Sequence, residues 1–302
     1  MRMSFFHWLV LAAVSASQAI AADDLPKFTR TEDVIYGRKF GTALTLDVFQ
    51  PEKPNKCAVI FMVSGGFFSS HDAINPRFYA AFLERGYTVF AVVHGSQPRF
   101  YIPEITQDIH RAVRFIRHNA AKYGVDPDKF GISGASAGGH LSLTMGTQGG
   151  PGKSEAKDPV DRESSAVQAV ACFFPPTDFL NWGKEGENAV GIGPLKNFKP
   201  AFGPRSDNDE DRVALGKEIS PINFVTSKTA PTLIIHGDLD RLVPIQQSKI
   251  FEERCRKENV PFRLIVKEGK DHGWQGLDKD MALCADWFDK YLREKTERAG
   301  KD

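Results

Sequence analysis

The stretch FGISGASAGGHLSL, Phe130–Leu143, decides how the rest of the sequence is interpreted. It places Ser136 between Gly134 and Gly138 in the spacing G-x-S-x-G, after a strand-like segment and before a helix-like one. In so tight a turn, side chains two residues either side of the serine would collide, and glycine removes them. An isolated G-x-S-x-G is most simply a structural turn, but this strand–turn–helix setting predicts a nucleophilic serine.

A serine hydroxyl is a weak nucleophile and needs a base beside it. His272, in GKDHGW, follows the last predicted strand and precedes the last predicted helix, where a loop can hold it over Ser136. The other histidines are expected in a leader (His7), on a solvated helix face (His110, His118), packed in a helix (His140), bracing a turn (His236), or in loops that can line the site (His71, His94).

The base in turn needs an acid that fixes its tautomer. The segment HGDLDRLVP follows the strand predicted at 232–237 and offers Asp238 and Asp240. Asp238 directly follows a glycine and suits a turn cap. Asp178, in PPTDF, lies one strand earlier and is a third candidate.

Backbone N–H groups must stabilise the negative charge that develops on an acyl oxygen. The segment VSGGFFSS, after the strand predicted at 57–63, contains Gly65 and Gly66, whose N–H groups can turn inward. The N–H of Ala137, at the start of the helix after Ser136, is the other predicted donor.

The whole sequence alternates strand and helix patterns, which predicts an α/β fold. Strand patterns occupy residues 34–37, 44–51, 57–63, 87–93, 130–134, 167–174, 232–237 and 262–267. Helix patterns occupy residues 76–85, 103–123, 137–146, 245–258 and 280–295. We therefore expect a mostly parallel sheet of about eight strands with helices on both faces.

Two stretches break this alternation. Residues 149–165 are glycine-rich and charged and are predicted to form a loop. Residues 181–218 are predicted to be irregular, with GIGPLKNFKPAFGP at their centre. Loops this long inside a compact domain are usually functional lids or disordered segments. The sequence thus predicts one domain over residues 22–302, with a lid-like insertion at about 181–218.

Residues 1–21 have the pattern of a secretory signal peptide: one Arg, an apolar run from Phe5 to Val14, and small residues ending in Ala19-Ile20-Ala21. The apolar run is shorter than the ~20 residues of a membrane-spanning helix. A secreted or periplasmic protein is expected, without a membrane span after cleavage. The 39 Lys and Arg balance the 38 Asp and Glu, so no strong field favours nucleic acid.

The four cysteines are spaced unlike metal ligands or a redox motif. Cys57, Cys172, Cys255 and Cys284 form no C-x-x-C pair and lie in predicted strands and helices. We expect buried free thiols and no metal or organic cofactor.

Several stretches together resemble secreted α/β-hydrolases of the hormone-sensitive-lipase-like and feruloyl-esterase-like group, from about Val34 to Leu292. They are AVRFIRHNAAKYGVDPDKFGISGASAGGHLSL, FFPPTDF, HGDLDRLVP and DHGW. The resemblance implies that Asp240, three residues before Val-Pro, is the acid, and that His272 of His-Gly is the base. One departure is that the group's H-G-G-G loop appears here as Val63-Ser64-Gly65-Gly66.

The expected activity is hydrolysis of a carboxylic ester of a small molecule or carbohydrate through an acyl-enzyme. A serine peptidase of the prolyl-oligopeptidase type is an alternative, disfavoured because no propeller-like domain precedes the hydrolase pattern. A non-catalytic binding module is the other alternative. Aromatic residues in loops either line a pocket or pack the core: Phe67, Phe68, Phe100, Tyr101, Phe198 and Phe202.

Overall fold

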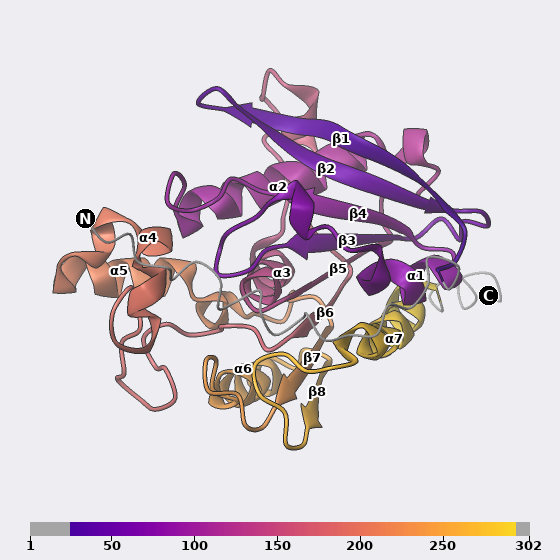
Figure 1. Ribbon diagram of the computed structural model, residues 1–302. Coiled ribbons are helices and arrows are strands. Elements are labelled where there is room, and N and C mark those ends of the chain that lie inside the picture. Colours follow the sequence, from indigo (N-terminus) through magenta and orange to yellow (C-terminus); the bar gives the residue numbers. More distant parts are fainter. Residues whose placement is uncertain (1–24, 294–302) are drawn as a thin grey trace, which may run out of the picture.

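The computed structural model describes residues 25–293, and the predicted signal peptide lies outside the described residues (Figure 1). Eight strands form one sheet in the spatial order β1-β2-β4-β3-β5-β6-β7-β8. The pairs β1–β2 and β2–β4 are antiparallel and the other five are parallel, which confirms the predicted sheet. The strands are β1 (Phe28–Lys39), β2 (Thr42–Pro51), β3 (Ala58–Val63), β4 (Thr88–Val93), β5 (Phe130–Ala135), β6 (Ala169–Phe173), β7 (Thr232–Gly237) and β8 (Phe262–Lys267).

Helices cover both faces of the sheet (Figure 1). One face is covered by α1 (Ala80–Glu84) and α7 (Leu277–Phe288), and the other by α2 (Ile102–His118), α3 (Ala137–Gln148) and α6 (Gln246–Lys257). Alternate residues of β3 point into the two cores, because side chains alternate along a strand. Ile60 and Met62 belong to the core under α2 and α3, whereas Val59 and Phe61 belong to the core under α7.

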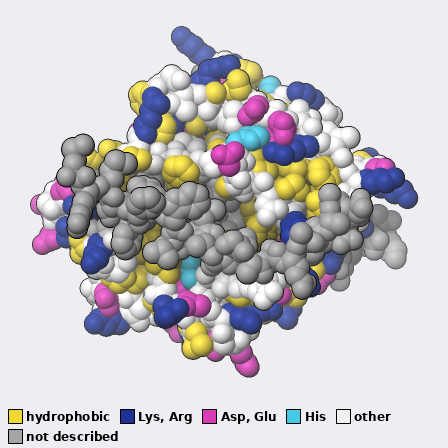
Figure 2. Space-filling view, viewed as in Figure 1, with side chains coloured by type: hydrophobic (Ala, Val, Ile, Leu, Met, Phe, Trp, Pro, Cys, Tyr) yellow, Lys and Arg dark blue, Asp and Glu magenta, His cyan; other side chains and the backbone are white. Residues whose placement is uncertain are grey.

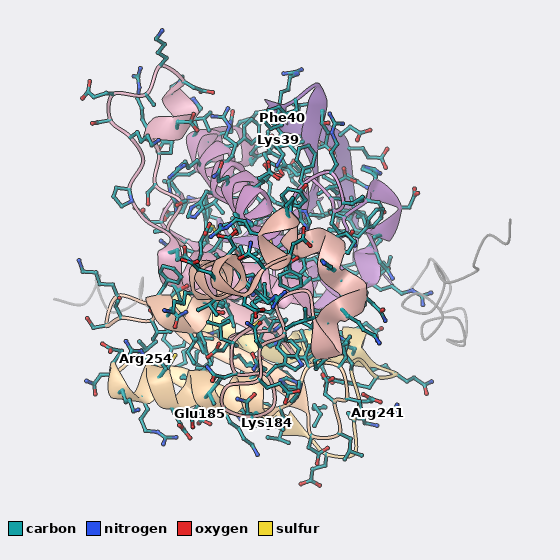
Figure 3. All side chains as sticks on the ribbon, turned by 90° about the vertical axis from the view of Figure 1, so that its left-hand side faces the viewer. Lys39, Phe40, Lys184, Glu185, Arg241 and Arg254 are labelled. Atoms are coloured by element: carbon teal, nitrogen blue, oxygen red, sulfur yellow. The ribbon has the colours of Figure 1, made fainter. Side chains whose placement is uncertain are left out.

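The segment between β6 and β7 differs from the prediction. It contains η6 (Gly193–Phe198), α4 (Lys199–Phe202), η7 (Pro204–Ser206) and α5 (Asp209–Ile219), beside the face covered by α2 and α3 (Figure 3). The expectation of an irregular segment is wrong for α5. The Asn208 side chain accepts a hydrogen bond from the Asp211 N–H and caps this helix. Its apolar pattern is short, since only Leu215, Gly216 and Ile219 are buried.

The outer surface carries both signs of charge. On the face shown in Figure 2, Lys and Arg side chains are interspersed with Asp and Glu. None of the helices between residues 25 and 293 combines the length and apolar character needed to cross a bilayer.

The four cysteines are free and buried, as predicted. Burial raises the pKa of Cys57 to about 11 and that of Cys255 to about 12. These thiols stay protonated at neutral pH, and a thiol is a much poorer nucleophile than a thiolate.

The turn between β5 and α3 brings two backbone segments into close contact. Ser136 has φ 54° and ψ −118°, a strained conformation for a residue with a side chain. A Cβ on Gly134 would lie 2.6 Å from the Gly138 carbonyl, and one on Gly138 would lie 2.6 Å from the Met62 carbonyl oxygen. Both glycines are therefore required, because α3 begins in direct contact with the backbone of β5 and β3.

This contact makes a prediction for Gly138→Ala. The added methyl meets backbone that cannot rotate away, so we expect the free energy of unfolding to fall by about 1–3 kcal/mol. Gly150→Ala is the matched control, since a Cβ there meets nothing within 4 Å, and we expect a change within about 0.5 kcal/mol. Urea unfolding followed by circular dichroism measures both. Equal stabilities of the two variants would contradict the close contact.

Candidate active site

Three side chains predicted from the sequence meet at the carboxyl ends of the strands. Ser136 follows β5, Asp240 follows β7 and His272 follows β8. The Ser136 Oγ lies 2.9 Å from His272 Nε2, and His272 Nδ1 lies 2.8 Å from Asp240 Oδ2. The Asp240 side chain is fully buried, whereas the His272 side chain is 18% exposed. The hydrogen bonds thus connect a buried carboxylate, through His272, to the half-buried Ser136.

Four groups form hydrogen bonds with the Asp240 carboxylate. Its Oδ1 accepts from the N–H groups of Leu242 and Val243, and its Oδ2 contacts His272 and His236. Burial alone raises the pKa of Asp240, but the bonds from His236 and His272 outweigh burial and hold that pKa well below its usual range. Asp240 is therefore ionised at neutral pH and can stabilise a protonated His272.

His236 braces the loop that carries this carboxylate. Its Nε2 lies 2.8 Å from the Val243 carbonyl, which can only accept, so Nε2 carries a proton. Its Nδ1 lies 2.6 Å from the Ser248 hydroxyl. The structure therefore places His236 in the turn-bracing position that the sequence predicts.

The other two candidate acids lie in turns. The Asp238 carboxylate accepts from the Gly269 N–H at 2.7 Å and ties the loops after β7 and β8 together. The Asp178 carboxylate accepts from the Leu180 N–H and the Asn181 amide. Neither carboxylate contacts His272, so the geometry singles out Asp240.

The predicted oxyanion loop needs one correction. The N–H of Gly65 donates to the Phe68 carbonyl at 2.9 Å, so Gly65 is not free to bind a substrate oxygen. The two residues inside this tight turn, Gly66 and Phe67, have φ values of 57° and 64°. Neither donates its N–H to another group of residues 25–293, and the same holds for Ala137. No sequence pattern identifies Phe67 as a donor, because its left-handed conformation suits glycine or asparagine better.

A small apolar cavity of about 30 Å³ lies next to Ser136. Gly66, Phe67 and Ala137 line it on the side of the oxyanion loop. The insertion contributes Phe198 and Phe202. Of the other aromatic residues proposed for a pocket, Phe68 is exposed, Phe100 is buried beneath Lys39, and the Tyr101 ring lies against Gly203.

A larger cavity of about 570 Å³ lies elsewhere, between β1, α2 and the loop before β6. Ser136, Asp240 and His272 do not line this cavity. Arg111 lines this larger cavity, and its guanidinium pairs with Asp158 at 2.7 Å and with Asp161 at 2.8 Å. Because Ser136 lines the smaller cavity and not the larger one, the candidate active site lies at the smaller cavity.

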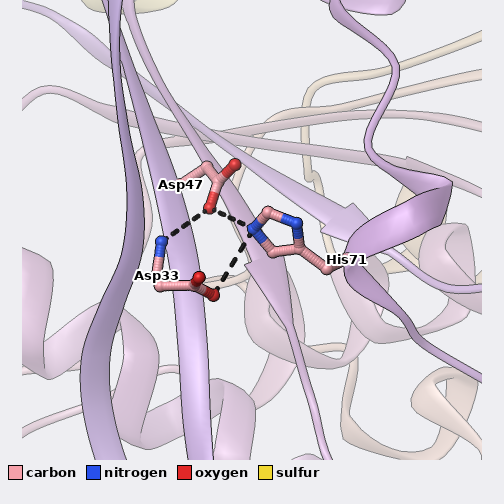
Figure 4. Close-up of side chains that lie close together, drawn as sticks. All are labelled: Asp33, Asp47 and His71. Carbon is pink, nitrogen blue, oxygen red and sulfur yellow. Dashed lines mark hydrogen bonds and ion pairs between the residues drawn. The ribbon is translucent and has the colours of Figure 1, made fainter.

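Asp33, Asp47 and His71 form the one group in residues 25–293 with metal-ligand geometry, their ligand atoms lying within 4.8 Å of one another (Figure 4). The buried Asp47 already accepts from His71 at 2.8 Å and from the Arg30 guanidinium, whose positive charge disfavours a cation there. We therefore interpret this group as a clasp between the β1–β2 hairpin and the loop after β3.

Of two further histidines, one differs from expectation. His110 is not solvated: its Nδ1 lies 2.8 Å from the Ser165 hydroxyl, and burial lowers its pKa to about 4. His140 is packed in α3 as expected, with Nδ1 3.2 Å from the Pro176 carbonyl. Its Nε2, however, is buried without a hydrogen-bond partner among the described residues.

The sheet topology and the serine turn define the chain as an α/β-hydrolase. A sequence model of the BD-FAE family matches residues 46–255, more than half of the chain, and the chain belongs to that family.

Curated relatives carry esterase names. Esterase LipQ of Mycobacterium tuberculosis is 31% identical over 238 residues, which cover 75% of this chain and 53% of LipQ. The probable carboxylic ester hydrolase LipM of the same organism is 26% identical over 230 residues, 74% of this chain and 51% of LipM. The chain thus spans about half the length of these relatives.

Solved structures share the fold over most of its length. A truncated carbohydrate esterase from gut microbiota is 28% identical with a TM-score of 0.73, covering 90% of this chain and 99% of that chain. An acetyl ester-xyloside bifunctional hydrolase from Caldicellulosiruptor lactoaceticus has a TM-score of 0.72, covers 88% of this chain and 97% of that chain, and at 24% identity shows the fold alone.

The geometry around His272 makes a prediction for Asp240→Asn. The amide can still accept from the loop N–H groups, but it no longer fixes the His272 tautomer, and we expect kcat to fall on the order of 10⁴-fold. Turnover of p-nitrophenyl acetate at neutral pH measures this loss. Asp238→Asn and Asp178→Asn are the controls, and both should turn over at nearly the wild-type rate. Collapse of either control with an active Asp240→Asn would contradict the assignment.

Proposed function

We propose that the protein is a carboxylic ester hydrolase that works through an acyl-enzyme on Ser136. The observation that carries this proposal is the unbroken line of hydrogen bonds from Ser136 through His272 to Asp240. The esterase names of LipQ and of the carbohydrate esterase structure support it.

In the first step the Ser136 Oγ attacks the ester carbonyl carbon while His272 Nε2 takes the hydroxyl proton. The negative charge forms on the former carbonyl oxygen, where the N–H groups of Gly66, Phe67 and Ala137 can stabilise it. Asp240 remains ionised and stabilises the imidazolium. When the tetrahedral intermediate collapses, His272 gives its proton to the departing alkoxide, and the acyl group stays on Ser136.

The second step repeats this chemistry with water. His272 takes a proton from water, whose oxygen attacks the acyl carbon. The new tetrahedral intermediate collapses, the proton returns to the Ser136 Oγ, and the carboxylic acid leaves. No step requires a group beyond those of the chain and the two substrates.

The cavity beside Ser136 suits a short acyl chain. Its small volume, about 30 Å³, and its apolar walls favour a small alkyl group. A Cβ on Gly66 would lie 2.7 Å from the Phe198 ring, so Phe198 packs directly on the oxyanion turn. We propose that the segment 181–218 acts as a lid that limits acyl size, and that the alcohol side is a carbohydrate, as the name of the gut carbohydrate esterase suggests.

Export to the periplasm or the medium remains part of the proposal, on the pattern of residues 1–21. A peptidase and a non-catalytic module are the rival functions. A panel of substrates distinguishes them, each assayed with the purified protein and with Ser136→Ala. The panel contains p-nitrophenyl esters with acetyl, butyryl and octanoyl groups, methyl ferulate, acetylated xylan and a proline-containing peptide. Hydrolysis of esters alone, lost in Ser136→Ala, is expected. The proposal would be overturned if the peptide were cleaved and the esters were not hydrolysed. Equal rates of ester hydrolysis by the wild-type protein and by Ser136→Ala would also overturn it.

Phe198→Ala tests the lid separately. Removing the ring opens the cavity, so we expect kcat/KM for butyryl relative to acetyl esters to rise by about ten-fold or more, since each methylene accommodated in an apolar pocket is worth about 1–3 kcal/mol. Phe262→Ala is a matched control, because Phe262 is also half-buried but packs on Phe251 in another part of the core. Unchanged selectivity with a large loss of melting temperature in Phe198→Ala would show that the segment is structural.

A further inference from the structure

A hydrogen bond between Ser64 and His94 anchors the oxyanion loop, the segment after β3 that contains Gly66 and Phe67. Val63 stands at the position where the resembling hydrolases carry the histidine of H-G-G-G, and Ser64 stands at the position of the first glycine. The Ser64 hydroxyl lies 2.8 Å from Nε2 of His94, the residue directly after β4. The side chain that this sequence lacks in the loop is thus matched by a histidine supplied from the neighbouring strand.

The direction of this hydrogen bond follows from the other side of the ring. His94 Nδ1 lies 2.7 Å from the Gly95 carbonyl, which can only accept, so Nδ1 carries the proton. Burial lowers the pKa of His94 to about 4, so the ring is neutral at neutral pH and has no proton left for Nε2. The Ser64 hydroxyl must therefore donate to Nε2, which fixes the Ser64 rotamer.

The far end of the same loop is fastened to the same segment. The His94 N–H donates to the Ser69 hydroxyl, and the Ser69 N–H donates to the Ser96 hydroxyl at 2.7 Å. The Gln97 N–H donates to the Phe67 carbonyl at 3.2 Å. This last bond orients the peptide plane that follows Phe67, one of the two residues inside the turn.

The anchoring segment is itself fixed. The Gly95 N–H donates to the buried Asp108 carboxylate of α2 at 3.0 Å, and the Lys39 ammonium binds the same oxygen at 2.6 Å. Lys39 lies at the end of β1, beside Phe40 at one edge of the view in Figure 3. The polar chain from Ser64 to Lys39 therefore connects the oxyanion turn to α2 and to the hairpin.

We propose that His94 is a positioning residue that, through Ser64, holds the N–H groups of Gly66 and Phe67 toward the oxygen of the reacting acyl group. The inference rests on the proposed function, because these donors act only if Ser136 is the nucleophile and negative charge forms on an oxygen beside it. It extends that function by naming two residues, neither of which lines the cavity beside Ser136, that determine transition-state stabilisation.

The fold offers a matched control with the same chemistry. His110 and Ser165 form a second buried histidine–serine pair at 2.8 Å, and burial lowers the pKa of this histidine to about 4 as well. This pair joins α2 to the loop before β6 and contacts none of the three donors. Ser165→Ala therefore removes a comparable hydrogen bond, together with the hydroxyl's contacts to Gly150, without touching the oxyanion loop.

The experiment compares Ser64→Ala, His94→Leu, the double variant and Ser165→Ala. Loss of one direct oxyanion donor costs about 10²–10³ in kcat, and a loosened donor should cost less, so we expect about a ten-fold fall in kcat with KM changed by less than about two-fold. Inhibition by a trifluoromethyl ketone, whose adduct carries the oxyanion, should weaken by a similar factor. The double variant should have no lower kcat than His94→Leu, since both substitutions remove the same Ser64–His94 hydrogen bond.

His94→Gln tests whether the acceptor is what matters. The glutamine Oε1 can stand where Nε2 stands and accept from Ser64, so activity should return most of the way to the wild-type rate. Melting temperatures of all variants identify any that fail to fold, in which case Ser64→Ala, the smallest change, decides. Wild-type kcat and inhibition in Ser64→Ala, or a loss equal to that of Ser165→Ala, would overturn the inference.

The rate at which a fluorophosphonate labels Ser136 needs no ester substrate, so it separates this inference from the proposed function. The phosphoryl oxygen uses the same donors, and we expect about ten-fold slower labelling in Ser64→Ala than in wild type. Slower labelling in a protein that hydrolyses no ester of the panel would keep the positioning role and refute the ester hydrolase. Equal labelling rates would refute the positioning role whatever the substrate.

Discussion

The structure depends on the close passage of α3 over the backbone of β5 and β3. Because a Cβ on either flanking glycine would lie 2.6 Å from a main-chain carbonyl group, the turn can be this tight only with Gly134 and Gly138. That tightness forces Ser136 to φ 54° and lifts its hydroxyl above the edge where the strands end. The strain is stabilised by the rest of the core, in which the strands β3 and β5 are buried on both faces.

Loops at that edge then supply one group each. The loop after β7 presents an ionised Asp240 held by two main-chain N–H groups, the loop after β8 presents His272, and the loop after β3 presents N–H groups from a turn closed by the Gly65–Phe68 bridge. Each loop is fixed by hydrogen bonds away from the reacting atoms, such as those of His236 and His94. Preorganisation of this kind is what lets weak individual groups stabilise a transition state.

The parts predictable from sequence were those encoded in local pattern. Apolar runs and glycines predicted all eight strands, and the order of loops after parallel strands placed Ser136, Asp240 and His272 at one edge. The assignment of Gly65 as an oxyanion donor is wrong, because the residue types alone do not indicate which N–H group closes a two-residue turn. The helix α5 and the Ser64–His94 pair were missed for related reasons: one has a short apolar stripe, and the other joins residues distant in sequence.

The central claim is that one strained serine performs the chemistry, and covalent labelling followed by peptide mapping tests it most directly. The purified protein is treated with a fluorophosphonate, digested, and analysed by mass spectrometry. We expect a single adduct, on the peptide containing Ser136, together with loss of ester hydrolysis in proportion to labelling. An adduct on a different serine, or full hydrolysis with Ser136 completely labelled, would contradict it.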